Sequence, residues 1–511
     1  MPIKHALPVT REQDFAAWYQ AVISEADLAE ESGVRGCMVI RPWGWGIWER
    51  IQRLLDDRIK ATGHDNCYFP LFIPLSYFEK EAEHVEGFAK EMAVVTHHRL
   101  IGDGKGGLVP DPDAKLEEPL VVRPTSETVI GAAFARWIQS WRDLPVKINQ
   151  WANVVRWEMR TRMFLRTSEF LWQEGHTAHA SADEAREHTR RMLDVYAELA
   201  EQDLALPVVK GEKPENERFP GAVETWSIEA MMQDGKALQA GTSHFLGTNF
   251  ASAQNIRFQN AAGQLELANT TSWGVSTRMI GGVIMVHGDD DGLRVPPRIA
   301  PWQIVIVPML RDQPEDEAIV DYCRALQGEL AKLSAFGEPV RALVDLKHGK
   351  AATKRWTWVK KGAPLILEVG GRDTANANVS VIRRDSLYRE DGKLDSAVMA
   401  RDAFMGAAAA TLEAIQAALF TQAAERLRAN IAPVADWAGV EARFAEGQRN
   451  PGWAEVAWAK PTAAELDGVV ERLKALKLTI RNAPVEQAAG DGPCVFTGRP
   501  AVERVLIGRA Y

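Results

Sequence analysis

The stretch VVRWEMRTRMFLRTSEFLWQEGHTAHA, residues 154–180, decides the fold. It contains two strand-like runs joined by a polar loop that is rich in arginine. Arg156 and Glu158 stand two residues apart, so a strand would place both on one face, where a guanidinium can bind a phosphate or a carboxylate through two hydrogen bonds. Phe170 offers a ring that can stack on a planar base. A salt-bridged strand pair around a core phenylalanine would give the same pattern.

Upstream, the sequence predicts an amphipathic helix followed by a strand that contains prolines. Apolar residues at offsets 0, 4, 7, 8 and 12 give the helix one buried face: Ile47, Ile51, Leu54, Leu55 and Ile59. Gly63 ends the helix, and the apolar run CYFPLFIPL follows at residues 67–75. Pro70 lacks a backbone donor, so we expect the run at a sheet edge or an interface. Taken alone, this pattern indicates no more than a helix stop and an edge strand.

Downstream, the string GVSTRMIGGVIMVHG at residues 274–288 joins a strand to a helix-compatible apolar run. Arg278 begins that run beside small residues, which indicates a cation docked against a ligand that lies over the sheet. An ordinary strand-to-helix turn is the alternative interpretation.

The three patterns, in this order and at these separations, resemble motifs 1, 2 and 3 of the class II aminoacyl-tRNA synthetases. Three further strings resemble the prolyl-tRNA synthetases of the archaeal and eukaryotic-like type: RPTSE at 123–127, FLWQEGHTAH at 170–179 and QAGTSH at 239–244. The resemblance covers essentially the whole chain. It implies ATP-dependent attachment of L-proline to tRNA(Pro) through a prolyl-adenylate, with Mg²⁺ as cofactor.

The resemblance also implies the residues of a proline site. Thr125 and Glu127 would accept the two N–H donors of the proline imino group. Arg156 would bind the proline carboxylate, and the walls around the ring would be Trp172, Glu174, His176 and His244. Thr/Ser followed by Glu is also a helix-capping pattern, and either histidine is as easily a satisfied core imidazole.

For ATP, the resemblance implies that Arg156 bridges the proline carboxylate and the α-phosphate. Glu158 would contact the adenine side, and Arg166 would hold the γ-phosphate. Phe170 and Arg278 would enclose the adenine by stacking and cation–π contact. The remaining ATP residues would be Gln239, Thr242 and Ser276, with Gln239 also at the Mg²⁺ end. Of all these, Arg156, Arg278 and Glu158 are the expected catalytic residues.

The order of elements predicts an α+β fold with an antiparallel-sheet catalytic domain over residues 1–296. Three prolines between residues 294 and 302 mark its end. Beyond them strands and helices alternate, which predicts an α/β anticodon-binding domain over 297–405 and a small α/β C-terminal domain over 406–511.

Seven basic residues and one acid lie between Val340 and Lys361, a cluster that suits a phosphate backbone or, alternatively, a solvated helix face. Lys354 belongs to this cluster. The family's EIGPRD-like string becomes EVGGRD here, so Glu368 and Arg372 would read anticodon guanines. Gly371 stands where the family usually has proline, which leaves the local turn open.

The amino-acid composition limits the number of domains, the binding partners and the cellular compartment that the chain can have. With 511 residues, 46% of them hydrophobic and 25% charged, the chain should fold into several domains, and its net charge of −9 argues against DNA binding by a uniformly basic surface. The four cysteines are scattered, which indicates a reducing compartment. Because the sequence has neither a signal peptide nor a long uncharged apolar run, we expect a cytoplasmic protein that avoids membranes.

We expect a homodimer with Pro70 at the interface. After Cys323 only Cys494 remains, so a C-terminal zinc site of four cysteines cannot form, and we expect no structural zinc. Tyr511 matches the family's tail tyrosine, which folds toward the active site, although a frayed end is equally compatible. No room exists between His179 and Thr242 for the editing domain of the common bacterial enzymes.

The sequence disfavours two alternative functions. Threonyl-tRNA synthetase is disfavoured because it needs a pocket zinc held by cysteine, and no cysteine lies between Cys67 and Cys323. A non-catalytic paralogue that only binds tRNA is disfavoured because both Arg156 and Arg278 are present.

Overall fold

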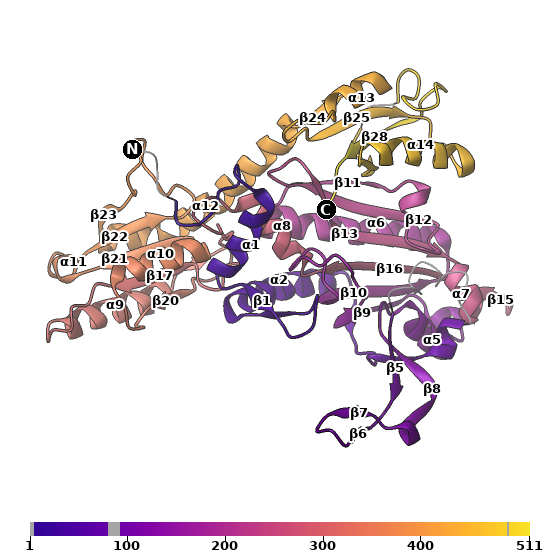
Figure 1. Cartoon of the computed structure of the whole chain (residues 1–511), viewed down its shortest axis with the longest axis horizontal. Helices are drawn as coiled ribbons and strands as arrows, with labels where there is room; N and C mark the ends of the chain where they lie inside the picture. Colours follow the sequence, from indigo (N-terminus) through magenta and orange to yellow (C-terminus); the bar gives the residue numbers. More distant parts are fainter. Residues whose placement is uncertain (1–4, 80–91, 488–489) are drawn as a thin grey trace.

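An eight-stranded sheet forms the centre of the chain in the computed structural model, which describes residues 5–79, 92–487 and 490–511 (Figure 1). Its strands pair antiparallel, apart from the parallel pair β3–β9. The order across the sheet is β27 (Ala483–Pro484), β11 (Val208–Glu212), β12 (Glu224–Met231), β13 (Ala237–Gly247), β16 (Asn269–Ser276), β10 (Glu169–His179), β9 (Val146–Val155) and β3 (Asp65–Asn66). The predicted antiparallel catalytic sheet is confirmed.

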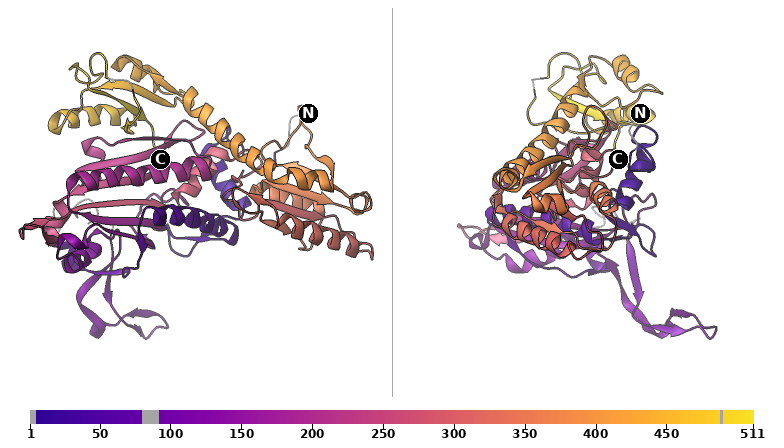
Figure 2. Two further views of the ribbon diagram at one scale, coloured as in Figure 1. Left: turned by 180° about the vertical axis from the view of Figure 1, so that it is seen from behind. Right: turned by 90° about the vertical axis from the view of Figure 1, so that its left-hand side faces the viewer.

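One face of this sheet is covered by helices. Seen from behind, α6 (Ala182–Glu198) and α2 (Pro42–Ala61) lie across the sheet (Figure 2). Trp273 and Val275 of β16 pack into the same buried cluster as Tyr196 of α6. The predicted apolar face of α2 is buried in that cluster: Ile47, Ile51, Leu54, Leu55 and Ile59. Side chains alternate along a strand, so the neighbours of Trp273 and Val275 point to the opposite, open face.

Further helices complete the catalytic domain. They are α1 (Phe15–Glu25), α5 (Glu127–Trp137), α7 (Asn249–Gln254), α8 (Arg278–His287) and the one-turn η4 (Leu199–Asp203) that continues α6. Two short hairpins lie outside the main sheet: β1 (Ala29–Glu31) with β2 (Met38–Ile40), and β14 (Arg257–Gln259) with β15 (Leu265–Leu267).

The local elements around the three motifs agree with the sequence in one place and differ in another. The helix-compatible run that starts at Arg278 forms a helix, α8, whose apolar residues are all buried. In the run at 67–75, only Phe72–Pro74 forms a strand, because Pro70 lacks the donor that would continue the ladder.

An arm projects from the catalytic domain at the bottom of Figure 1. It is built from the three-stranded sheet β4 (Phe72–Pro74), β8 (Lys115–Val122) and β5 (Ala93–His97), with β6 (Leu100–Gly102) and β7 (Leu108–Pro110) at its tip and α3 (Leu75–Glu79) beside it. Two apolar side chains at the tip, Leu100 and Leu108, are 57% and 71% exposed.

The second domain has a mixed five-stranded sheet with helices beside it. The order is β20 (Ala342–Val344), β17 (Ile304–Pro308), β21 (Leu365–Val369), β22 (Asn378–Arg383) and β23 (Ala397–Ala400). The helices are α9 (Asp316–Leu330), α10 (Ala351–Lys361) and α11 (Gly371–Ala375), and the short pair β18 (Ser334–Ala335) and β19 (Glu338–Pro339) follows α9. The three strands β20, β17 and β21 are parallel and almost fully buried, as expected for an α/β unit.

A long helix, α12 (Arg401–Ala429), links this domain to the C-terminal one (Figure 2). The predicted boundary at 405/406 falls inside it, and side chains as far as Leu419 belong to the core of the second domain. α12 is long enough to span a membrane, and its mean hydropathy reaches 1.4 over 18 residues. Its buried apolar side chains, however, contribute to the protein core.

The C-terminal domain has its own core and also extends the catalytic sheet. Its sheet is ordered β24 (Ile431–Pro433), β25 (Trp453–Trp458), β28 (Glu503–Gly508) and β26 (Thr479–Ile480), with helices α13 (Trp437–Arg443) and α14 (Ala463–Ala475). The short strand β27 leaves this domain and pairs with β11 at the edge of the catalytic sheet.

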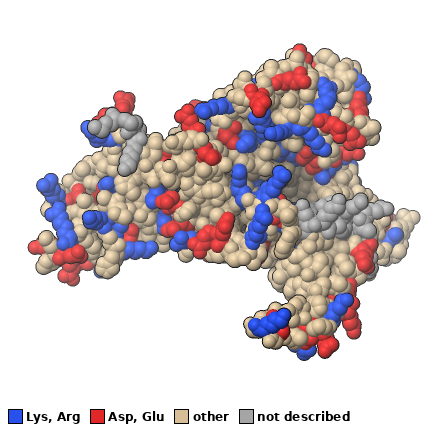
Figure 3. Space-filling view, in the orientation of Figure 1, with Lys and Arg blue, Asp and Glu red and all other residues tan. Residues whose placement is uncertain are grey.

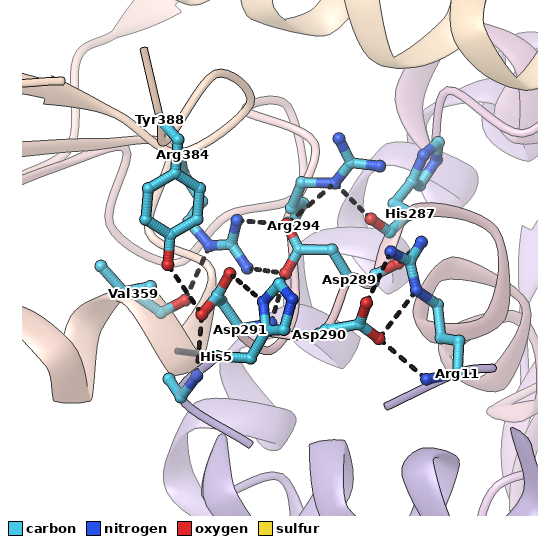
Figure 4. Close-up of polar contacts among 12 residues, drawn as sticks. His5, Arg11, His287, Asp289, Asp290, Asp291, Arg294, Val359, Arg384 and Tyr388 are labelled. Carbon is cyan, nitrogen blue, oxygen red and sulfur yellow. Dashed lines mark hydrogen bonds and ion pairs between the residues drawn. The ribbon is translucent and has the colours of Figure 1, made fainter. Parts of the chain in front are cut away.

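Charged contacts fix the second domain to the end of α8 (Figure 4). Arg384 donates to both carboxylate oxygens of Asp289, at 2.7 and 2.6 Å, and to the carbonyl oxygen of Val359 at 2.8 Å. Tyr388 donates to Asp291 at 3.0 Å. The turn after α8 is therefore bonded directly to the second domain.

Candidate active site

The open face of the sheet is hollow because the middle strand carries small residues there. Ser272, Gly274 and Ser276 of β16 are the residues that face away from α6. Larger side chains stand on the two flanking strands. Three cross-strand pairs with β10 place Trp172, Glu174 and His176 beside the small residues. Strand β13 places Thr242 and His244 on the other side.

A cavity of about 200 Å³ occupies this hollow. Its lining includes every residue predicted for proline, namely Thr125, Glu127, Arg156, Trp172, Glu174, His176 and His244, together with Gln239 and Thr242. Residues from four separate strings of the sequence therefore meet at one place.

Several lining residues were missed by the sequence analysis. They are Glu217, Arg218, Phe219 and Thr225, all from the connection between β11 and the start of β12. The Phe219 ring lies 4.8 Å from the His244 ring, and Thr225 bonds to the same imidazole at 3.0 Å. No local pattern marks Arg218 and Phe219, because the chain reaches the cavity there in an irregular loop.

Glu174 and His176 form a buried charged pair in this cavity. The Glu174 carboxylate accepts hydrogen bonds from Ser126 at 2.5 Å, Gln150 at 2.6 Å and His176 at 3.0 Å. Burial raises the pKa of Glu174, but the bonds from His176, Ser126 and Gln150 outweigh burial and leave that pKa below its usual range. Burial lowers the pKa of His176, but the bond to Glu174 and its charge outweigh burial and raise it.

His244, by contrast, is a neutral imidazole. Burial, followed by the positive charges of His176 and Arg156, lowers the pKa of His244 to about 3. Its ring lies against that of Phe219, and both rings line the cavity, so the neutral imidazole forms part of an uncharged wall.

Thr125 and Glu127 lie at the start of α5. The Thr125 hydroxyl donates to the Glu127 carboxylate, and Glu127 is only 8% exposed. Ser126 is the residue before the helix, but its side chain makes no capping bond and donates to Glu174 instead. Thr125 therefore does not cap this helix, and its hydroxyl remains directed into the cavity.

A second cavity of about 180 Å³ adjoins the first. The predicted ATP residues line it: Arg156, Glu158, Arg166, Phe170, Ser276 and Arg278. Arg156 lines both cavities. It was expected on a strand, but it follows the end of β9, where its Nε donates to the carbonyl oxygen of Pro124 at 3.0 Å.

The second cavity carries an excess of positive charge. Burial, together with the charges of Arg156 and Arg166, lowers the pKa of Arg278 to about 10. The one carboxylate among the lining residues, Glu158, is 4.0 Å from Arg166. Three guanidinium groups in one hollow suit a polyphosphate. Figure 3 shows Lys and Arg side chains gathered beside the central hollow of this face.

The basic cluster of the second domain differs from the prediction. Five of its seven basic side chains are bonded within the protein: Arg341 to Glu338, Lys354 to the carbonyl oxygen of Asp345, Arg355 to Glu368, Lys360 to Glu25 and Lys361 to Asp27. Lys354 is only 7% exposed, so in this structure it is not available to tRNA. Glu368 is also buried against Arg355, whereas Arg372 is exposed on α11.

The tail residue Tyr511 is ordered against the catalytic domain. Its hydroxyl donates to Asp234 at 2.5 Å, and its backbone N–H donates to the carbonyl oxygen of Ala237. The Arg162 guanidinium of the motif 2 loop lies 5.6 Å from its ring. The tail therefore packs beside that loop rather than fraying.

Comparisons with known proteins agree with this geometry. Residues 112–287 match the tRNA synthetase class II core domain (G, H, P, S and T), and residues 303–400 match the anticodon binding domain. A proline–tRNA ligase of Sphingomonas elodea is 77% identical over 510 residues, which cover 100% of both chains. The chain belongs to the prolyl-tRNA synthetases.

A more distant proline–tRNA ligase, from Bdellovibrio bacteriovorus, is 52% identical over 99% of both chains. The crystal structure of prolyl-tRNA synthetase from Cryptosporidium parvum, complexed with L-proline and AMP, matches with a TM-score of 0.87 and 34% identity over 99% of this chain and 97% of that one. The predictions of a class II fold and of a proline–tRNA ligase are confirmed, and the threonyl and non-catalytic alternatives are set aside.

Proposed function

We propose that this prolyl-tRNA synthetase joins L-proline to ATP across its two adjoining cavities, with Arg156 at the point where the substrates meet. The observation that carries this proposal is that Arg156 lines both cavities. A guanidinium has several donors in a fixed plane and can bind a carboxylate and a phosphate together. It thereby brings nucleophile and electrophile into contact.

Proline lies in the first cavity. Its imino group donates to Thr125 and Glu127, which supply the acceptors that a secondary ammonium needs. The ring lies against Trp172 and the neutral imidazole of His244. The Glu174–His176 pair holds the base of the cavity rigid, because both side chains are buried and bonded to each other.

ATP lies in the second cavity. Phe170 and Arg278 enclose the adenine, Glu158 contacts its polar edge, and Ser276 lies beneath the nucleotide. Arg166 holds the γ-phosphate. Gln239 and Thr242, which line the adjoining first cavity, approach the nucleotide at its ribose. The excess of positive charge described above supports this assignment, because three guanidinium groups face a single carboxylate, that of Glu158, among the residues that line the cavity.

The reaction then needs no covalent bond to the protein. A proline carboxylate oxygen bonds to the α-phosphorus while the bond from that phosphorus to the bridging oxygen breaks, and pyrophosphate leaves with the electron pair. The terminal ribose hydroxyl of tRNA next attacks the carbonyl carbon of prolyl-adenylate, and AMP leaves. Arg156 and Arg278 stabilise the negative charge on the phosphate in the first step.

The residues present fit one Mg²⁺ ion. Mg²⁺ prefers oxygen ligands and commonly takes one or two from the protein and the rest from phosphates and water. Gln239 offers a half-buried carbonyl oxygen in the cavity. Gln239 would hold the ion, which would supply positive charge against the negative charge of the pyrophosphate.

Anticodon recognition by the second domain is also part of the proposal. Arg372 is exposed and can donate to a guanine edge. Glu368 can take part only if its bond to Arg355 opens. Among the basic residues of the cluster, the exposed Lys347 and Lys350 are better placed than Lys354 for the tRNA backbone.

The enzyme belongs to the type without a bacterial editing insertion. Between His179 and Ala237 the chain forms α6, η4, β11, β12 and short connections, and these pack on the catalytic sheet. The likeness to the Cryptosporidium parvum structure over 97% of that chain supports the same type.

We also propose that two copies of the chain form a homodimer through the segment around Pro70. Beside Pro70, which is itself exposed, Tyr68 is 73% and Phe72 is 48% exposed. Apolar side chains exposed together in one short segment are typical of an interface. A cytoplasmic location fits a translation enzyme of this kind.

The test of the proposal is Arg156→Ala, with Arg160→Ala as its matched control. Arg160 is exposed on the same loop and lines neither cavity. Proline-dependent exchange of pyrophosphate into ATP should fall by at least about 10³-fold in Arg156→Ala, as expected for a lost transition-state contact of about 4 kcal/mol, and remain within about twofold in Arg160→Ala. Exchange near the wild-type rate in Arg156→Ala would remove this residue from the mechanism.

A further inference from the structure

The turn of the N-terminal hairpin, residues 32–37 between β1 and β2, is bonded to the motif 2 loop, residues 156–168. The carbonyl oxygen of Gly36 accepts a hydrogen bond of 2.7 Å from the backbone N–H of Ser168. The Arg35 guanidinium donates to the carbonyl oxygen of Met159 at 2.9 Å. The hairpin therefore contacts the loop near both of its ends.

These bonds lead directly to the bridging arginine. The carbonyl oxygen of Ser168 accepts a 2.8 Å hydrogen bond from the backbone N–H of Arg156. Gly36 thus holds Ser168, and Ser168 holds the backbone from which the Arg156 side chain starts. The same loop carries Glu158 and Arg166, which line the second cavity.

Packing alone does not fix the loop on this side. A cavity of about 510 Å³ lies between the hairpin and the loop, lined among others by Arg35, Gly36, Thr161 and Met163. Across this open space the loop is held by hydrogen bonds: those with Gly36 and Arg35 of the hairpin, and one of 2.8 Å from the Tyr19 hydroxyl of α1 to the carbonyl oxygen of Met163.

The position of Gly36 admits no side chain. Its φ is +81°, a conformation that residues with a Cβ rarely adopt. A Cβ at this position would also overlap the Ser168 hydroxyl and lie 2.7 Å from the Thr161 methyl group. Gly33, in the same turn, has no such restriction, since nothing lies within 4 Å of a Cβ added there.

We propose that Gly36 and Arg35 are positioning residues for adenylate formation: through Ser168 and Met159 they hold the motif 2 loop so that Arg156, Glu158 and Arg166 face ATP. The inference rests on the proposed function, because it assigns these three residues to the nucleotide. Proline should depend less on the hairpin, since most of its cavity is formed by strands β10, β12, β13 and β16.

The test compares Gly36→Ala with Gly33→Ala in the full chain. In pyrophosphate exchange, Gly36→Ala should raise the KM for ATP about tenfold and the KM for proline less than threefold, and Gly33→Ala should leave both within twofold. Hydrogen exchange of the peptide spanning residues 156–168 should accelerate in Gly36→Ala and not in Gly33→Ala.

Arg35→Ala is the second variant, because Arg35 is exposed and its loss should not unfold the chain. It should raise the KM for ATP about threefold. If Arg35→Ala and Gly36→Ala lower kcat without changing the KM for ATP, or if Gly33→Ala gives the same change as Gly36→Ala, the hairpin does not position the loop. Failure of this inference can be distinguished from failure of the proposed function, because in the second case the wild-type protein would show no proline-dependent exchange.

Discussion

Three charged side chains, Glu229, Lys213 and Arg481, form a buried cluster at the edge of the catalytic sheet, and their charges predict how substitutions there change stability. Glu229 of β12 has one carboxylate oxygen 2.9 Å from the Lys213 ammonium, and the other accepts hydrogen bonds of 3.1 and 2.7 Å from the Arg481 guanidinium. The side chains of Glu229, Lys213 and Arg481 are 0%, 1% and 6% exposed. Arg481 stands just before β27, so this cluster also joins the C-terminal domain to the catalytic sheet.

Counting the buried charges predicts that Glu229→Gln and Lys213→Met have very different effects on the free energy of unfolding. Glu229→Gln leaves two buried cations without an anion, and removing one partner of a buried ion pair costs about 3–5 kcal/mol. Lys213→Met leaves Glu229 and Arg481 as a neutral pair with both hydrogen bonds intact, and replacing a buried charge by an apolar group of similar volume is often neutral or stabilising.

Scanning calorimetry measures the difference. A loss of 3–5 kcal/mol corresponds to a fall in Tm of about 6–20 °C for a domain of 150–250 residues. We expect that fall in Glu229→Gln and a change of less than about 3 °C in Lys213→Met. Glu12→Gln is the control, because its carboxylate is 85% exposed in a surface pair with Arg449. Equal losses in Glu229→Gln and Lys213→Met, or an unchanged Tm in Glu229→Gln, would show that the charge argument is wrong.

Three other predictions concern pH, tRNA and accuracy. Burial is the main cause that lowers the pKa of His64 to about 4 and that of His188 to about 2, so the unfolded chain takes up protons below about pH 6.5 while the folded chain does not. These two histidines should account for about 4 kcal/mol of lost stability at pH 5. Because the pKa values of His244 and His287 are lowered in the same direction, urea unfolding should show a loss of at least about 4 kcal/mol between pH 7.5 and pH 5. Arg372→Ala should lower aminoacylation of tRNA(Pro) at least tenfold and leave pyrophosphate exchange unchanged, with the exposed Arg311→Ala as control; an equal loss in both assays would indicate a folding defect. Alanine fits a cavity shaped for proline, and each missing methylene gives only about 1–3 kcal/mol of discrimination, so alanyl-adenylate should form at roughly 10²–10⁴-fold lower efficiency, and the purified enzyme should not hydrolyse alanyl-tRNA(Pro) faster than buffer does.

The active-site residues were predicted from the resemblance to the prolyl-tRNA synthetases, and strand geometry explains why they lie together. Trp172, Glu174 and His176 alternate along β10, and Thr242 and His244 do so along β13, so a period of two places each set on one face. The register of β16 then brings the two sets together across small residues. Helix α2 was equally predictable, because its apolar residues repeat with the period of a helix.

The parts that the sequence did not reveal depend on contacts between distant residues. Phe219 reaches the cavity in a loop, where no periodic pattern marks an inward-facing side chain. The basic cluster was counted along the chain, but Lys360 and Lys361 bond to Glu25 and Asp27, which are more than 300 residues away. Lys354 was predicted to bind tRNA, and its burial on α10 could not be read from charge alone.

Pyrophosphate exchange with the wild-type chain, run with each of the twenty amino acids in turn, decides the assignment of this site to proline. With ATP and Mg²⁺ present, proline should support rapid exchange, alanine should support it weakly, and the other amino acids should give far lower rates than proline. Rapid exchange with threonine or another amino acid and none with proline would mean that the cavity of Thr125, Glu127 and His244 does not bind proline, and the assignment of its residues would have to be abandoned.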